Sequence, residues 1–389
     1  MRKRLRRMRL VQVSDYLYLD YVSTTPLHQE VFNMYTELLN KYYANSDSLH
    51  DLGVRVNKLQ EKARFQIASS LNVQPSEVIF TSGASEANNM AIKGVAWANK
   101  HKGKHIITSA IEHSSVMEST LQLKKEFGFD VTYLAVNKQG QVTLDMVKQA
   151  LRSDTILVSL MMINNEIGSI NPINEIAEYL KYNSKAYFHV DGVQAFGKYD
   201  IDLFNIDLFS MSMHKIYGLK GSGILVKKRH VEMLSLITAG QQEGTHRGGT
   251  ANYCVNIMAA KSIRLALTDQ AKHFKMVQSI NEYLCDQLRQ IPGIIINSFA
   301  NGSIYIVNFS YPKLKSEVMM NGLNQAKIAV SAQSTCHSKA SEISHVYKAL
   351  KLPDHIAESA IRIGLSHLVS RKDIDRFISE LKGIIKSYG

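Results

Sequence analysis

The chain has 389 residues, of which 45% are apolar and 21% charged, so it is long enough for a large core and two to three domains. Its net charge is +12, and six Lys or Arg residues among the first nine account for half of that, which leaves the rest only mildly basic. The sequence contains no run of about 18 apolar residues, so it predicts no transmembrane helix. Three cysteines without CxxC spacing argue against a disulfide framework or a cysteine-ligated metal site, so we expect a cytoplasmic protein with no membrane partner.

The first segment, MRKRLRRMRLVQ (1–12), is basic and contains no acidic residue. It lacks the apolar stretch of a secretory signal and the serines of an organelle transit peptide. The interpretation that we favour is a disordered, solvated arm. The alternative is an arm that makes a weak contact with RNA or with an acidic partner.

Between residues 77 and 228, short runs with β propensity alternate with segments of helical length and periodicity. This alternation is typical of crossover units and predicts an α/β fold with a mainly parallel seven-stranded sheet and helices on both faces. Functional residues are then expected at the carboxyl ends of the strands. The runs are EVIFT (77–81), HIITS (105–109), DVTYLAV (130–136), TILVSLMM (155–162), AYFHVD (186–191), DLFSMSM (207–213) and GILVKK (223–228).

The region after residue 251 has a different pattern of predicted helices and strands. Residues 252–291 are nearly free of Gly and Pro and predict a long helix that bridges domains. The segments 293–299, 303–310, 327–333 and 360–366 predict strands, and 315–327 and 371–389 predict helices. Together they indicate a second, smaller α+β domain.

The first strand runs into SGASEANN (82–89), whose small residues allow the backbone of Gly83, Ala84 and Ser85 to approach an anion at a helix N-terminus. An ordinary helix cap is an equally good interpretation of this turn.

Asp191 ends a strand three residues before Gln194. A carboxylate buried there needs a cationic partner, although Asp is also a common helix cap.

Two more strand ends carry His113 and the pair Asn164 and Asn165, and a fifth carries Lys215 in SMSMHKIYG (210–218). Each residue alone has an ordinary structural explanation, and an isolated His-Lys at a strand end most often turns into solvent. Their convergence with the phosphate turn and Asp191 on one sheet edge is more specific. It indicates a site for a phosphorylated, nitrogen-containing aromatic cofactor that a lysine holds covalently.

Ten motifs occur in the order and approximate spacing of the pyridoxal-phosphate-dependent cysteine desulfurases, the NifS/IscS-like group of the class V aminotransferase-like family. The chain resembles that family over about residues 16–385. The motifs are YLDYVSTTP, NSDSLHDLG, FTSGASEANN, HIITSAIEH, INNEIG, HVDGVQAFGK, SMSMHKIYG, QEGTHRGGT, VSAQSTC and IRIGLS.

The resemblance implies a fold-type I architecture and a homodimer with shared active sites. It divides the chain into the arm (1–12), a large cofactor-binding domain (28–265) and a small domain (13–27 and 266–389) with the nucleophilic cysteine. It also implies pyridoxal 5′-phosphate as cofactor, L-cysteine as substrate and a sulfur-acceptor protein as partner, in iron-sulfur cluster assembly or tRNA thiolation.

The resemblance further implies the role of each site residue. Lys215 would form the Schiff base with the cofactor, Asp191 would keep the pyridine nitrogen protonated, and His113 would stack on the ring and assist proton transfer. Gln194 would bind the ring hydroxyl, and Arg362 would bind the substrate carboxylate. Phosphate would be held by Ala84, Ser85, Ser212, His214 and, from the other subunit, Thr250, while Asn165 and Asn45 would help with the substrate.

Cys336 stands at the family's nucleophile position, whereas Cys254 and Cys285 lie in helical patterns and are expected to pack as small apolar groups. The resemblance implies that its thiolate attacks the substrate sulfur, so that alanine leaves and a persulfide remains. A free thiol is only a few per cent ionised at neutral pH, and we hypothesise that His337 or the substrate-side imidazole promotes its ionisation.

Several positions depart from the family pattern, namely Tyr21, Ser46, Gln241 and His367. None of them removes a residue that the core chemistry requires. Two alternatives stay open at this point: a related selenocysteine lyase or aminotransferase of the same fold, and a non-catalytic RNA-binding relative. The presence of Cys336 weighs against an aminotransferase, and the set Lys215, Asp191, His113 and Arg362 weighs against loss of catalysis.

Overall fold

A computed structural model describes residues 15–332 and 343–389 of the chain. The basic arm, Cys336 and His337 lie outside this part. Within it, no helix combines the length and the apolar character that crossing a membrane requires.

A seven-stranded sheet forms the centre of the larger half, as the strand pattern predicts. The order is β2-β8-β7-β6-β5-β3-β4, and β8 alone runs antiparallel to its neighbours. The mainly parallel arrangement brings the carboxyl ends of β2, β3, β5, β6 and β7 to one edge. The strands are β2 (Val78–Thr81), β3 (His105–Ser109), β4 (Asp130–Leu134), β5 (Thr155–Met161), β6 (Tyr187–Asp191), β7 (Leu208–Ser212) and β8 (Gly223–Lys227).

Side chains alternate between the two faces of this sheet, and both faces are buried. Ile79, Ile106 and Leu225 pack with α3 (Ala84–Asn99) and α4 (Ser114–Phe127) on one face. Their neighbours in sequence, such as Phe80, Ile107 and Ile224, pack on the other face with α5 (Leu144–Ala150), α6 (Ile173–Asn183) and α7 (Tyr253–Thr268). Coverage of both faces explains why the strands read as continuous apolar runs.

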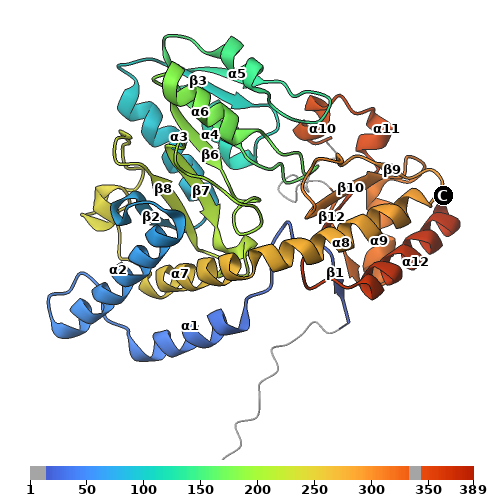
Figure 1. Cartoon of the computed structure of the whole chain (residues 1–389), viewed down its shortest axis with the longest axis horizontal. Coiled ribbons are helices and arrows are strands. Elements are labelled where there is room, and N and C mark those ends of the chain that lie inside the picture. Colours follow the sequence, from blue (N-terminus) through green and yellow to red (C-terminus); the bar gives the residue numbers. More distant parts are fainter. Residues whose placement is uncertain (1–14, 333–342) are drawn as a thin grey trace, which may run out of the picture.

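Two N-terminal helices, α1 (Gln29–Lys41) and α2 (Asp51–Leu71), pack against α7 along the lower edge of the view in Figure 1. Imidazole rings cap both of them, because Nδ1 of His28 and of His50 accepts a backbone N–H of the first turn. The 3₁₀ turn η1 (Pro75–Glu77) then leads into β2.

The predicted long helix over 252–291 is two helices in succession, α7 and α8 (Gln270–Arg289), which together cross the lower part of Figure 1. They meet at Asp269, whose φ of −103° and ψ of 4° interrupt the helical geometry. Helix α7 lies on the large sheet, whereas α8 packs into a separate core with the C-terminal elements. The predicted helical segment is thus present as two helices with a break at their junction, and its bridging of two domains stays a proposal.

The C-terminal part contains an antiparallel sheet of β12 (Ala360–Gly364), β10 (Ile306–Ser310) and β9 (Ile295–Ile296). Helices α9 (Ser316–Gln325) and α12 (Arg371–Tyr388) pack on it, and α10 (His345–Ala349) and α11 (Asp354–Ala357) precede β12. The N-terminal strand β1 (Leu17–Tyr18) pairs in parallel with β11 (Ile328–Ala329). Residues at both ends of the chain therefore share one core.

Two predicted strands are much shorter than their sequence runs. Among the described residues, only Ile295–Ile296 of 293–299 and Ile328–Ala329 of 327–333 form ladder pairs. The second run leaves β1 after Ala329 and makes an isolated bridge from Ser331 to Arg362. The domain boundaries given above (28–265 against 13–27 with 266–389) stay our proposal, which the separate apolar cores and the β1–β11 pairing support.

Candidate active site

Lys215 lies at the carboxyl edge of the large sheet, in the 3₁₀ turn η2 (Met213–Lys215) that directly follows β7. Its Nζ donates to the backbone carbonyls of Val22 at 2.7 Å and Ser23 at 2.6 Å. The segment that carries these carbonyls is itself tied to the turn, because the N–H of Thr25 donates to the carbonyl of His214 at 2.9 Å. The amine is therefore held in the protein interior rather than directed into solvent.

A cavity of about 570 Å³ opens beside Lys215. Ten of the predicted site residues line it: Ala84, Ser85, His113, Asn165, Asp191, Gln194, Ser212, His214, Lys215 and Arg362. They come from five strand ends of the large sheet and from β12 of the small one. The structure thus brings together residues that lie up to 278 positions apart.

One end of this cavity is suited to an anion. Helix α3 begins at Ala84 without a side-chain cap, after Gly83 with a φ of 157°. Its first backbone N–H groups and the helix dipole are therefore available for phosphate. Ser212, His214 and Lys220 line the same cavity, and burial together with Lys215, Lys220 and Lys198 lowers the pKa of His214 to about 4.

Asp191 occupies the middle of the site and is 5% exposed. Its Oδ1 accepts the N–H of Val193 at 3.0 Å, and its Oδ2 accepts Nδ2 of Asn88 at 2.8 Å. Within residues 15–332 and 343–389, no Lys or Arg forms a salt bridge with this carboxylate. A buried carboxylate that faces a cavity with neutral partners is suited to a cationic group on a ligand.

Asn88 has no role in the sequence-based prediction, although it lies within the quoted motif SGASEANN. Its Nδ2 also donates to Oγ of Ser115 at 2.9 Å, so it links α3 to the start of α4 beneath His113. The helical spacing could have identified it, since a residue four positions after Ala84 lies on the same side of α3.

His113 caps α4 at the cavity wall. Its Nδ1 accepts the N–H of Ser115 at 3.1 Å, which places the proton of the neutral ring on Nε2. Burial lowers the pKa of His113, with a further lowering by Lys215 and His345 against a raising effect of Asp191. The ring is therefore a neutral imidazole with its N–H at Nε2.

Arg362 projects from the middle of β12 and is 3% exposed. Its Nη1 donates to the carbonyl of Asn165 at 2.9 Å, and its Nη2 donates to Oδ1 of Asp20 at 3.0 Å and Oγ of Ser23 at 2.8 Å. Its Nε is buried without a hydrogen-bond partner. The guanidinium is thus fixed by three bonds, which leave two of its five N–H donors, on Nε and Nη1, unused among the described residues.

Asn164 does not line the cavity. Its Oδ1 accepts the N–H groups of Glu166 at 2.8 Å and Ile167 at 3.0 Å, so it stabilises the turn after β5. Asn45 and Thr250 are exposed and absent from the cavity of their own chain. Their loops lie together, because Nε2 of Gln242 donates to Oδ2 of Asp47 at 2.7 Å.

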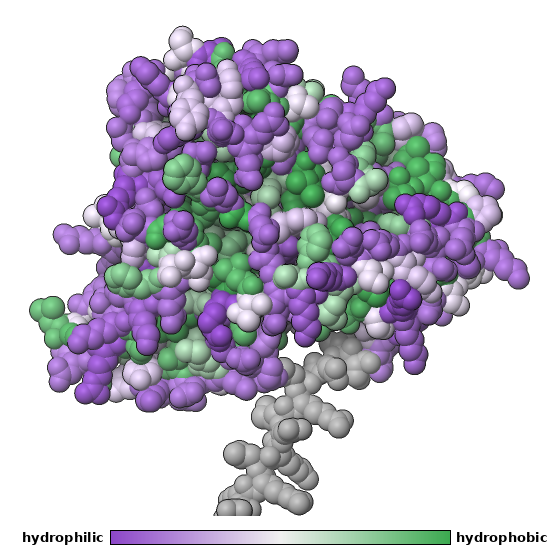
Figure 2. Space-filling view, viewed as in Figure 1, coloured by the Kyte–Doolittle hydropathy of each residue, from purple (hydrophilic) through white to green (hydrophobic). Residues whose placement is uncertain are grey.

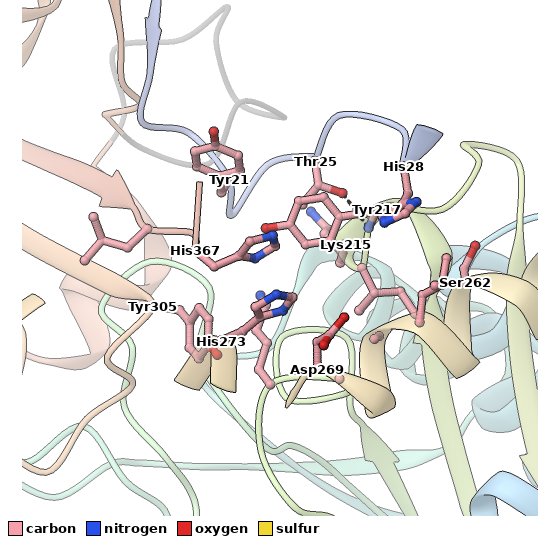
Figure 3. Close-up of a pocket in the computed structure, with 16 residues that line it drawn as sticks. Tyr21, Thr25, His28, Lys215, Tyr217, Ser262, Asp269, His273, Tyr305 and His367 are labelled. Carbon is pink, nitrogen blue, oxygen red and sulfur yellow. Dashed lines mark hydrogen bonds between the residues drawn. The ribbon is translucent and has the colours of Figure 1, made fainter. Parts of the chain in front are cut away.

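Figure 3 shows a second cavity, of about 120 Å³. In the described parts of the chain, Lys215 is the only residue that lines both cavities. Two of the departures from the family pattern, Tyr21 and His367, face the second cavity. The ring of His367 stacks on that of His273 with centroids 3.5 Å apart, and burial and His273 lower its pKa to about 4. Ser46 is 6% exposed and Gln241 is exposed, and neither lines these cavities.

Comparisons with known proteins agree with this geometry. The family model for class-V aminotransferases matches residues 17–377. The cysteine desulfurase IscS of Dictyoglomus turgidum is 38% identical over 374 residues, which cover 95% of this chain and 94% of that protein. The chain belongs to the cysteine desulfurase family. A solved NifS-like protein superimposes on it with a TM-score of 0.90 and 31% identity, covering 96% of this chain and 100% of that one. SspA, solved in complex with cysteine, has a TM-score of 0.79 and 30% identity, with coverages of 90% and 98%.

Membership of this family makes the protein a pyridoxal-phosphate-dependent enzyme, and its cavity fits that cofactor. The uncapped N-terminus of α3 fits the phosphate, and the buried Asp191 fits a protonated ring nitrogen. Lys215 supplies the amine and Gln194 lies on the same wall. When bound, the cofactor supplies an electron-withdrawing ring that stabilises negative charge at the substrate carbon.

Proposed function

We propose that this cysteine desulfurase converts L-cysteine to L-alanine and retains the sulfur as a persulfide on Cys336. The observation that carries the proposal is the placement of Lys215, Asp191 and Arg362 on the walls of one cavity. An amine, a buried carboxylate and a buried guanidinium are the groups that an amino-acid substrate of a pyridoxal-phosphate enzyme requires.

Each residue has a task that follows from its contacts. Arg362 binds the substrate carboxylate through its guanidinium, which lines the cavity. Asp191 keeps a positive charge on the ring nitrogen, and Asn88 fixes the orientation of that carboxylate. With Nδ1 accepting the N–H of Ser115, His113 carries its proton on Nε2, where it can donate to a group in the cavity. Lys215 provides the amine that binds the cofactor and later moves a proton.

The sulfur transfer balances without another reactant. The thiolate of Cys336 attacks the substrate sulfur, so that an S–S bond forms and the C–S bond breaks. The electron pair of the broken bond goes to the substrate carbon, which takes up a proton and leaves as alanine. Cys336 lies outside the described residues, but the described chain before it reaches Ala332, and the adjacent Ser331 accepts the backbone N–H of Arg362 at 2.7 Å. This pairing supports a nucleophile segment that starts beside the substrate-binding arginine.

We propose a homodimer in which Thr250, and with it Asn45, serves the active site of the other subunit. The two loops that carry them lie together and are exposed. A hydrophobic (green) group protrudes from the mostly hydrophilic left end of the view in Figure 2. Exposed apolar side chains where α1 meets α2 include Tyr43 (80% exposed), Leu49 (97%) and Leu52 (49%). Exposed apolar clusters of this kind are typical of protein interfaces.

The proposal also covers the setting of the enzyme. We propose a cytoplasmic location and a sulfur-acceptor protein as partner, in iron-sulfur cluster assembly or in tRNA thiolation. A weak RNA contact through the basic arm is part of the proposal. Unchanged salt-dependent RNA binding after deletion of residues 2–9 would remove that contact.

The test of the proposed activity is direct. Purified protein loaded with pyridoxal 5′-phosphate, given L-cysteine and a thiol reductant, is expected to release alanine and sulfide in equal amounts. A His337→Ala variant with unchanged pH dependence and turnover would remove His337 from the mechanism. Alanine release without sulfide, or no release of either, would contradict the proposed function.

A further inference from the structure

Lys198 follows the cofactor-binding turn after β6 and lines the second cavity, behind Lys215. Its Nζ donates to Oε1 of Gln194 at 3.1 Å and lies 5.5 Å from the centre of the Tyr305 ring. Gln194, in contrast, lines the first cavity. The Lys198–Gln194 bond therefore crosses the wall between the two cavities.

We propose that Lys198 is a positioning residue that fixes the side-chain amide of Gln194, so that the amide presents its NH₂ group to the cofactor. This inference rests on the proposed function, since it assumes that pyridoxal phosphate occupies the first cavity. It assigns a role to a residue that neither the motifs nor the reaction chemistry uses.

The chemistry of the two groups sets the orientation. A lysine ammonium has three donors and no acceptor, whereas a glutamine amide has a donor end and an acceptor end. Only the oxygen of Gln194 can therefore face a protonated Lys198. The nitrogen then points the other way, where it donates to the carbonyl of Val22 at 3.2 Å on the wall of the first cavity.

The carbonyl of Val22 also accepts Nζ of Lys215 at 2.7 Å. Gln194 Nε2 and Lys215 Nζ thus converge on one backbone oxygen, which places the amide donor next to the amine that binds the cofactor. A flipped amide would direct an oxygen lone pair at the cofactor's ring oxygen, where a donor is required.

The surroundings of Lys198 leave Gln194 as its principal polar partner. No carboxylate lies within salt-bridge distance of Lys198 in the two described stretches of the chain. Burial, together with Lys215 and Arg362, lowers the pKa of Lys198 to about 7. The Tyr305 ring provides a cation–π contact that favours the protonated form.

The test uses the full chain and measures the dissociation constant of pyridoxal 5′-phosphate, alongside the absorbance of the bound cofactor. Lys198→Met keeps most of the unbranched apolar side chain and removes its donor. We expect it to raise the dissociation constant about 3- to 10-fold, the effect of one hydrogen bond. The control is Lys227→Met, which removes a buried lysine at the opposite end of the sheet and should leave cofactor binding unchanged.

A double-mutant cycle separates this role from a general effect of charge. In a Gln194→Ala background, Lys198→Met is expected to cause no further loss of affinity. Full loss in both backgrounds would contradict the inference. Lys198→Gln gives a second test. A glutamine both donates and accepts, so it does not fix one orientation of the Gln194 amide, and we expect it not to restore affinity. Wild-type binding by this variant would overturn the inference.

The same experiment distinguishes this inference from the proposed function. A wild-type protein that binds no pyridoxal 5′-phosphate would contradict the proposed function itself. A wild-type protein that binds the cofactor and releases alanine and sulfide, together with a Lys198→Met variant of unchanged affinity and spectrum, would contradict the role of Lys198 alone.

Discussion

Nδ2 of Asn88 donates to Oδ2 of Asp191 over 2.8 Å, in a contact that is buried between α3 and the end of β6. The bond joins two segments that lie 103 residues apart. It orients the carboxylate that we propose as the partner of the cofactor's ring nitrogen, so Asn88 would support that site through Asp191 without supplying the charge itself.

Replacing Asn88 with Ala should weaken cofactor binding. A hydrogen bond to a charged group contributes about 1.5 to 3 kcal/mol, which corresponds to roughly 10- to 100-fold in the dissociation constant of pyridoxal 5′-phosphate. Equilibrium dialysis of the cofactor checks this. Asn183→Ala, an exposed helical asparagine, is the matched control, and equal affinities of the two variants would show that the Asn88 contact is unimportant.

Replacing Arg362 with Gln should affect the substrate rather than the cofactor. The guanidinium is the buried cation available for the substrate carboxylate, so we expect kcat/KM for L-cysteine to fall by about 100-fold or more while cofactor absorbance persists. Steady-state alanine release measures this. Arg289→Gln on the exposed face of α8 should behave as wild type, and an unchanged kcat/KM in Arg362→Gln would remove the arginine from substrate binding.

A methyl group at Gly192 should destabilise the fold. A Cβ built there lies 1.8 Å from Cζ of Phe209, so the ring on β7 must move. We expect the free energy of unfolding to fall by about 1 to 3 kcal/mol. Gly383→Ala on α12 has no atom within 4 Å of its Cβ and should raise that free energy by up to about 1 kcal/mol. Denaturant titration compares the two variants, and equal or inverted effects would argue against this packing.

Glu112 makes stability depend on pH. Burial raises its pKa to about 8, against the opposing effect of bonds from Ser109 and Met161 and with a further rise from Asp191. The folded state keeps this proton while the unfolded chain loses it at its ordinary pKa of 4.5. The stabilising contribution is therefore complete below about pH 4.5 and is lost as the pH rises through about 8.

Glu112→Gln should remove this pH dependence, because the amide stays neutral. We expect the difference in the free energy of unfolding, variant minus wild type, to rise by about 1 to 4 kcal/mol between pH 5 and pH 8. Unfolding curves at these pH values measure the difference. The exposed Glu118→Gln serves as control, and a constant difference for Glu112→Gln across this range would show that the carboxyl is ionised when folded.

The strand pattern was sufficient to predict the seven strands of the large sheet, since each is an apolar run between turn residues. It did not predict that the helix over 252–291 divides at Asp269, because the break depends on packing against two different cores. The lengths of β9 and β11 were overestimated, because the run of β11 leaves β1 after two residues and bridges β12 at Ser331, and β9 pairs with β10 over two residues.

The site residues that end strands were predictable, because parallel strands bring their carboxyl ends together. Lys215, Asp191 and His113 are in this group. Asn88 and Lys198 were missed, since each acts on another side chain rather than on a ligand. Their contacts depend on the distance between α3 and β6 and on the turn after β6, which no spacing in the sequence specifies.

The central claim is that sulfur from cysteine is retained on Cys336. The most direct measurement is mass spectrometry of peptides from the loaded enzyme after exposure to L-cysteine without reductant. We predict one added sulfur atom on the peptide with Cys336, none on those with Cys254 or Cys285, and loss of sulfide release in Cys336→Ala but not in Cys285→Ala. Sulfur on either of the other cysteines, or normal sulfide release by Cys336→Ala, would contradict the account.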